Sequence, residues 1–256
     1  MTDKEIDALI PGFELKGSSE ECIFMVHGFT GSAPELYPLA KLLQEKGYSV
    51  VVHALPGHGT SSIKALRKTS AKDWMESVKK AYEEVAKKYK RVYVFGYSMG
   101  GTLAITLTKE HHLDGLILCE PALMPNNKFA WATKLFCFTP LKVRWEGPDL
   151  EFPDHSERYL RGQKGFYVKS AADLLTVAAK AKKLLPKIVC PIMMTWAGKD
   201  TSILKKGVDT IEKITPANIK TYKIYPNNTH HLPSEPEKEQ LAKDIDLFIK
   251  KTIPQK

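Results

Sequence analysis

Short apolar runs alternate along the chain with longer segments in which apolar residues recur every three or four positions. The short runs predict buried strands, and the longer segments predict helices with one apolar face. We expect strands over residues 21–27, 48–54, 91–96, 116–119, 192–196 and 220–225. We expect helices over residues 36–46, 73–89, 101–111, 171–185, 208–214 and 237–251. This alternation is typical of an α/β fold with a mostly parallel central sheet and helices on both faces.

The alternation stops between residues 121 and 170, where prolines, aromatic residues and charges mix without a clear strand. We therefore predict one core built from residues 1–120 and 171–256, with residues 121–170 inserted as a small cap. Open α/β sheets bind ligands at the carboxyl ends of their strands. The cap is expected to lie over that edge.

The composition agrees with one large globular domain, since 43% of the 256 residues are hydrophobic and 26% are charged. The formal net charge of +9 comes mainly from lysines on helical segments, which indicates solvated helix faces. No arginine-rich cluster with interleaved aromatics is present, so we expect no nucleic-acid partner. No apolar run approaches the ~18 residues that span a bilayer, so no stable membrane insertion is expected. The acidic, polar N-terminus differs from a signal peptide, which predicts a cytoplasmic location.

The cysteines and histidines do not show the spacing of a metal site. Cys22, Cys119, Cys137 and Cys190 lie far apart without a CxxC pair, and no HExxH pattern occurs. We expect reduced thiols and neither a metal nor an organic cofactor.

The strongest chemical signal is Gly96-Tyr97-Ser98-Met99-Gly100, a GxSxG pattern between a predicted strand and a predicted helix. In a nucleophile elbow this turn holds the serine in a strained backbone conformation. Side chains two residues before and after the serine would collide, which explains the glycines at 96 and 100. Ser98 is therefore the predicted nucleophile.

A serine hydroxyl needs a histidine base that a carboxylate orients. In this type of fold the acid and the base follow the nucleophile, in that order, in loops after later strands. Asp200 follows strand 192–196, and His230 follows strand 220–225. Asp200 could also serve as a turn or N-cap residue. We favour His230 as the base, and the adjacent His231 stays an alternative.

The tetrahedral intermediates of acyl transfer carry an oxyanion, which backbone N–H groups stabilise. Met99, directly after the nucleophile, is one predicted donor. The glycine-rich loop His27-Gly28-Phe29-Thr30-Gly31 lets the backbone turn its amides inward, and Phe29 is the second.

These motifs resemble bacterial carboxylesterases and monoacylglycerol lipases of the α/β-hydrolase superfamily, and the resemblance spans most of the chain. It rests on residues 27–31, 55–59, 69, 73–74, 96–101, 200 and 227–230. It implies the α/β-hydrolase fold with a nucleophile, acid and base at Ser98, Asp200 and His230 and oxyanion donors at Phe29 and Met99. Thr229 departs from the small residue usual before the histidine, and residues 121–170 carry little family sequence.

We therefore expect a serine carboxylesterase that hydrolyses short- to medium-chain carboxylic esters or monoacylglycerols. A cinnamoyl esterase, a thioesterase or a carbon–carbon bond hydrolase would use the same triad. A non-catalytic ligand-binding protein is a weaker alternative, because such proteins usually lose part of the triad. The cap aromatics either line an acyl pocket or cover the cap's own core. They are Trp131, Phe136, Phe138, Trp145, Phe152, Phe166 and Tyr167.

Overall fold

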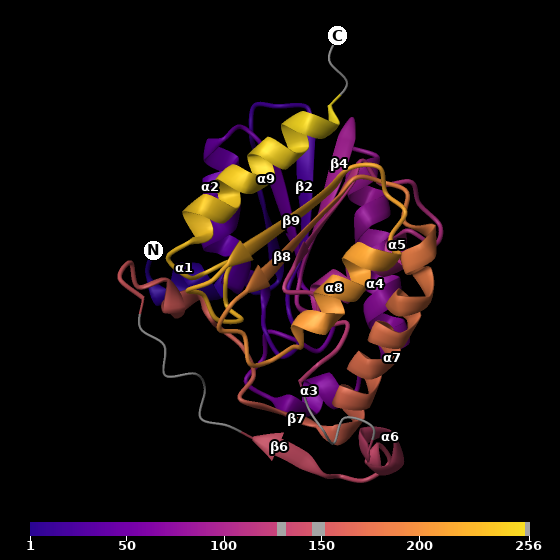
Figure 1. The fold of residues 1–256 in the computed structure, drawn as a ribbon. Coiled ribbons are helices and arrows are strands. Elements are labelled where there is room, and N and C mark those ends of the chain that lie inside the picture. Colours follow the sequence, from indigo (N-terminus) through magenta and orange to yellow (C-terminus); the bar gives the residue numbers. More distant parts are fainter. Residues whose placement is uncertain (127–131, 145–151, 254–256) are drawn as a thin grey trace.

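The central element of the computed structural model, which describes residues 1–126, 132–144 and 152–253, is a seven-stranded sheet (Figure 1). Its strand order is β1-β3-β2-β4-β5-β8-β9, and only β1 runs antiparallel to its neighbour within this described sheet. The strands are β1 (Gly12–Leu15), β2 (Glu21–Val26), β3 (Ser49–His53), β4 (Arg91–Tyr97), β5 (Gly115–Cys119), β8 (Ile192–Ala197) and β9 (Lys220–Tyr225). The predicted mostly parallel α/β sheet is confirmed.

Helices cover both faces of this sheet, as the sequence predicts. One layer contains α2 (Tyr37–Glu45) and α9 (Lys238–Thr252). The other contains α4 (Ala71–Ala86), α5 (Met99–Leu107), α7 (Val168–Leu184) and α8 (Lys205–Ile214). The short helices α1 (Asp3–Asp7) and α3 (Ile63–Arg67) lie outside these layers. No helix of the described ranges is long and apolar enough to cross a membrane.

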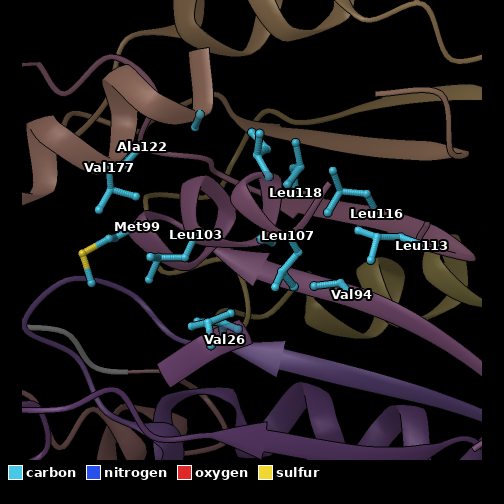
Figure 2. Packing of buried hydrophobic residues seen from close by; sticks show 14 of the residues in the cluster. Val26, Val94, Met99, Leu103, Leu107, Leu113, Leu116, Leu118, Ala122 and Val177 are labelled. Atoms are coloured by element: carbon cyan, nitrogen blue, oxygen red, sulfur yellow. The ribbon is translucent and has the colours of Figure 1, made fainter. Parts of the chain in front are cut away.

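Alternation along each strand feeds a separate core on each face. In β4, Val92 and Val94 join the cluster under α4, α5 and α7, whereas Tyr93 and Phe95 join the cluster under α2 and α9. Figure 2 shows part of the first cluster, with Leu107 of α5 beside Val94 and Leu103 beside Met99. The strands are therefore held from both sides, and their carboxyl ends are fixed platforms for the loops that follow.

The sequence pattern missed the short elements. Strand β1 pairs with β3 at the edge of the sheet, and its residues are half-buried or exposed. A four-residue edge strand needs no continuous apolar run, so it leaves no clear hydrophobic signal. The five-residue helices α1 and α3 were missed for the same reason.

The described residues 132–144 and 152–167, called the cap below, lie between β5 and α7. They contain α6 (Thr133–Phe136), β6 (Lys142–Arg144) and β7 (Gly165–Tyr167). The two strands pair antiparallel, in a region where the sequence shows no clear strand. All three residues of β6 are exposed, which removes the apolar pattern that would have revealed it. The domain boundaries at 120 and 171 stay a prediction.

Candidate active site

Ser98 lies at the sharp turn between β4 and α5, with a backbone φ of 53° and ψ of −116°. A side chain on Gly96 would overlap the carbonyl of Gly100, and one on Gly100 would overlap the carbonyl of Val26. The chain can therefore make this turn only with glycine at both positions. This agrees with the steric argument from the sequence.

Three backbone hydrogen bonds hold the turn in place. The Ser98 amide donates to the carbonyl of Cys119 at the end of β5, with 2.9 Å between nitrogen and oxygen. The Ser98 carbonyl accepts from the amides of Gly101 and Ala122, each at 3.0 Å. The strained residue is thus tied to its own helix and to the neighbouring strand, which keeps its hydroxyl in one position.

The structure brings Ser98, Asp200 and His230 together from three loops at the carboxyl edge. The distance from Ser98 Oγ to His230 Nε2 is 2.9 Å, and that from His230 Nδ1 to Asp200 Oδ2 is 2.6 Å. Asp200 Oδ1 accepts from the amides of Ser202 and Ile203, at 2.7 and 3.2 Å. A carboxylate fixed in this way makes Nδ1 of the imidazole the protonated nitrogen, so Nε2 faces the serine as an acceptor.

The charges around His230 favour proton uptake. Burial alone would lower the pKa of this imidazole, but the hydrogen bond and charge of Asp200, with Glu120 and Glu35 further away, raise it. For Asp200, burial acts to raise the pKa, and the His230 hydrogen bond and the two backbone amides outweigh it, so the pKa is lowered. The site therefore holds an ionised acid beside a histidine that is a better base than in water.

His231 occupies a different position. Its Nδ1 lies 3.4 Å from the hydroxyl of Tyr97, and its ring centroid lies 6.2 Å from that of His230. Burial, followed by the neighbouring His230, lowers the pKa of His231 to about 4. His230 is the histidine within hydrogen-bond distance of both Ser98 and Asp200.

The hydrogen bonds of the loop after β2 fix the orientation of the Phe29 amide. Leu55 N–H donates to His27 Nε2 at 3.0 Å, so His27 Nδ1 carries the proton and donates to the Gly28 carbonyl at 2.9 Å. The Gly31 amide donates to the same carbonyl at 3.3 Å. Because the peptide is trans, pinning the Gly28 carbonyl directs the Phe29 N–H to the opposite side. Among the described residues, neither this amide nor that of Met99 donates to a protein acceptor.

Glu35 is a buried carboxyl that the sequence analysis missed. Its Oε1 accepts the Gly28 amide at 2.8 Å, and the residue lines the same cavity as Ser98. A side chain on Gly31 would overlap this carboxylate, so the glycine leaves room for it. Burial raises the pKa of Glu35 to about 7. No local pattern distinguishes such a residue from a surface glutamate, because its burial depends on the folded loop.

Glu120, directly after β5, is a second buried carboxyl that the sequence analysis missed. It accepts from the Thr195 hydroxyl at 2.7 Å and from the Ala197 amide at 2.9 Å, and burial raises its pKa to about 7. These bonds fix the end of β8, from which the chain continues to Asp200. Glu120 directly follows the predicted strand 116–119, but nothing in its sequence neighbours distinguishes a buried carboxyl from an exposed turn residue.

Thr229, the departure from the family pattern, has a local partner. Its amide donates to Glu235 Oε2 at 2.7 Å, and its hydroxyl also bonds to the Glu235 carboxylate. Glu235 is buried and lies five residues after His230. The threonine therefore helps to hold the loop that carries the histidine.

A cavity of about 600 Å³ opens beside Ser98 and His230, between the core loops and the cap. Phe166 lines it and packs against Phe29, with 5.2 Å between ring centroids. Four other cap aromatics that the structure describes do not line it, so of the two alternatives, acyl lining holds among the described cap aromatics for Phe166 alone. Phe136 and Phe138 are exposed, and Phe152 and Tyr167 are buried away from the cavity. Trp131 and Trp145 lie outside the described residues.

Comparison with known proteins gives consistent matches. Residues 17–237 match the family model described as "Serine aminopeptidase, S33". The thermostable monoacylglycerol lipase of Bacillus sp. (strain H-257) is 31% identical over 75% of this chain and 78% of its own. The carboxylesterase of Bacillus subtilis (strain 168) is 22% identical over 93% of this chain and 96% of its own. The crystal structure of Paleococcus ferrophilus monoacylglycerol lipase superposes with a TM-score of 0.80 at 20% identity, covering 94% and 98% of the two chains.

Proposed function

Since this chain belongs to the α/β-hydrolase family described as "Serine aminopeptidase, S33" and hydrolyses ester bonds, we propose that it acts through an acyl-enzyme on Ser98. The observation that carries this proposal is the unbroken chain of hydrogen bonds from Ser98 through His230 to Asp200. The preferred substrates are short- to medium-chain carboxylic esters or monoacylglycerols, which fit a cavity of about 600 Å³.

In the first half-reaction Ser98 Oγ bonds to the ester carbonyl carbon while its proton passes to His230 Nε2. The carbonyl oxygen becomes an oxyanion and accepts hydrogen bonds from the amides of Phe29 and Met99. Collapse of this intermediate expels the alcohol, which takes the proton from His230, and leaves the acyl group on Ser98. Asp200 stabilises the imidazolium throughout.

In the second half-reaction a water molecule donates its proton to His230 and attacks the acyl carbon. The same two amides stabilise the second oxyanion. Its collapse breaks the bond to Ser98 and returns the proton to the serine, so the acid leaves and the enzyme is regenerated. These steps need no metal and no organic cofactor.

The test is the Ser98→Ala variant, assayed on p-nitrophenyl acetate, butyrate and octanoate. We expect kcat to fall by at least about 10⁴-fold, because the variant lacks the hydroxyl that lies 2.9 Å from His230 Nε2. A fluorophosphonate probe should label the wild type and not the variant, with circular dichroism as the folding control. Retained turnover in the variant would refute the acyl-enzyme.

A further inference from the structure

A second pocket of about 490 Å³ lies on the other side of the two-stranded sheet β6–β7 from the catalytic cavity. The register of β6 and β7 pairs Lys142 with Tyr167 and Val143 with Phe166. Since side chains alternate between the faces of a strand, Phe166 and Tyr167 point to opposite sides of β7. Phe166 lines the catalytic cavity, whereas Tyr167 lines the second pocket. The β6–β7 sheet thus separates the catalytic cavity from the second pocket.

The walls of the second pocket, called the basic pocket below, are positively charged. They carry Lys64, Lys142, Arg144 and Lys164, and no acidic residue lines them among the described residues. None of these cations forms an ion pair with a carboxylate of ranges 1–126, 132–144 or 152–253. By contrast, nearby cations at positions 158, 161 and 169 all pair with aspartates. The basic pocket therefore presents positive charge that the described protein does not neutralise.

Lys164 connects the basic pocket to the chemistry, because it lines both this pocket and the catalytic cavity. Its position is fixed by the preceding residue, the buried Gln163. The Gln163 amide donates to the Thr30 carbonyl at 2.6 Å, and its side-chain Nε2 donates to the carbonyls of Gly57 and Ser62 at 3.0 and 2.9 Å. The segment is therefore tied both to the oxyanion loop and to the loop that forms the far wall of the basic pocket.

We propose that the basic pocket binds the anionic group of an acidic ester substrate, while the ester carbonyl lies at Ser98. The group is a phosphate or a carboxylate, joined to the ester by a chain that passes Lys164. Four cations and the hydroxyls of Ser61 and Ser62 surround one concavity, which suits an oxyanion with several acceptor oxygens. Cations that served only to attract a membrane would need no shared pocket. This proposal rests on the proposed esterase function and names its substrate class.

The test compares matched neutral and anionic esters in wild type and in the double variant Lys142→Gln/Arg144→Gln. One arm places the charge on the acyl side, with p-nitrophenyl octanoate against the p-nitrophenyl monoester of suberic acid. The other places it on the alcohol side, with 1-octanoylglycerol against its 3-phosphate. In at least one arm the wild type should favour the anionic ester. The variant should lower the anionic-to-neutral ratio of kcat/KM by about three- to twentyfold, from the loss of two exposed charge contacts.

The matched control is Lys46→Gln/Lys213→Gln, which removes the same charge at the opposite edge of the sheet. Both lysines are exposed. Lys46 directly follows α2 and Lys213 lies in the last turn of α8, and these two helices lead into the starts of β3 and β9. This variant should keep the wild-type ratio. About 0.5 M NaCl should reduce the preference of the wild type, because exposed charge pairs are screened.

Two outcomes would overturn the proposal. The first is that the anionic-to-neutral ratio of kcat/KM is the same in wild type and in Lys142→Gln/Arg144→Gln in both arms, or that the wild type shows no preference for the anionic ester. The second is an equal loss for neutral and anionic esters that appears only on phosphatidylglycerol vesicles, which would make the cations a membrane contact. Failure of the proposed function is distinguishable, because it would appear as Ser98-independent turnover of the neutral esters.

Discussion

The carboxyl edge of the sheet and the cap above it hold their residues in different ways. At the edge, Ser98 is fixed by three backbone bonds, and Asp200 by two amides and a histidine. In the cap, large apolar side chains face solvent over a short stretch: Leu135, Phe136, Phe138, Leu141 and Val143. The residues proposed for the chemistry are therefore held by a packed scaffold, whereas the described cap leaves large apolar side chains exposed.

Within the carboxyl edge, we expect the largest difference in effect on kcat between the neighbouring residues His230 and His231. We expect His230→Ala to reduce kcat by about 10⁴-fold, because the serine loses the base that removes its proton. His231→Ala should stay within about tenfold, since that ring contacts Tyr97 rather than Ser98 or Asp200. The measurement is kcat on p-nitrophenyl butyrate for both variants. Equal losses would show that the doubled histidine works as a pair.

Glu35 provides a test of how burial at the carboxyl edge affects the pH dependence of stability. Its folded pKa of about 7 lies above the ordinary value of 4.5 for a glutamate, so the folded state binds more protons between these pH values. Stability must then fall as pH rises through this window, by about 3 kcal/mol when Glu35 is fully ionised. Glu35→Gln removes that loss while keeping an oxygen acceptor for the Gly28 amide. The variant should therefore be more stable than wild type at pH 8 and similar at pH 5.

Urea unfolding at both pH values measures the Glu35 effect, with the exposed Glu239→Gln as control. In wild type and in both variants, Glu120 also makes the free energy of unfolding fall as pH rises, because its pKa is also raised to about 7. The informative quantity is therefore the difference in unfolding free energy between Glu35→Gln and wild type, compared at the two pH values. Parallel curves for Glu35→Gln and wild type would mean that the carboxyl ionises at its ordinary pKa.

Phe166 belongs to both regions, since it is a cap residue that packs on Phe29 of the core. Phe166→Ala removes apolar surface from the cavity, so KM for p-nitrophenyl octanoate should rise about five- to tenfold, with kcat within about threefold. The acetate ester, too short to reach this ring, should change less. Phe136→Ala is the control, because that ring is exposed. An equal rise for acetate and octanoate would contradict an acyl contact.

The same comparison explains which features could be read from the sequence. Ser98 and Asp200 each follow a buried, apolar strand, whereas His230 follows β9, a partly exposed strand at the edge of the sheet. Their meeting point follows from chain order alone in this fold. Glu35 and Glu120 could not be found in this way, because a buried carboxyl is recognised only by partners distant in the chain. For Glu120 these are Thr195 and Ala197.

The cap was unpredictable for the opposite reason. In β6, Lys142, Val143 and Arg144 are all exposed, so no alternation of apolar and polar residues marks the strand. The aromatic residues left two alternatives open, an acyl pocket or the cap's own core, and the sequence could not decide between them. Only Phe166 of the described cap aromatics lines the cavity. Where burial does not impose a pattern, sequence periodicity carries little information.

The smallest predicted effect concerns Phe138, whose side chain is 89% exposed. Phe138→Ser should change the free energy of unfolding by less than about 0.5 kcal/mol, because the ring leaves almost no buried surface behind. Phe95→Ser at the core, where the ring is fully buried, should cost more than about 3 kcal/mol. Urea unfolding of the two variants measures the contrast directly. A large loss at Phe138 would mean that this ring is covered in solution, and the cap would then have to be regarded as a packed part of the fold.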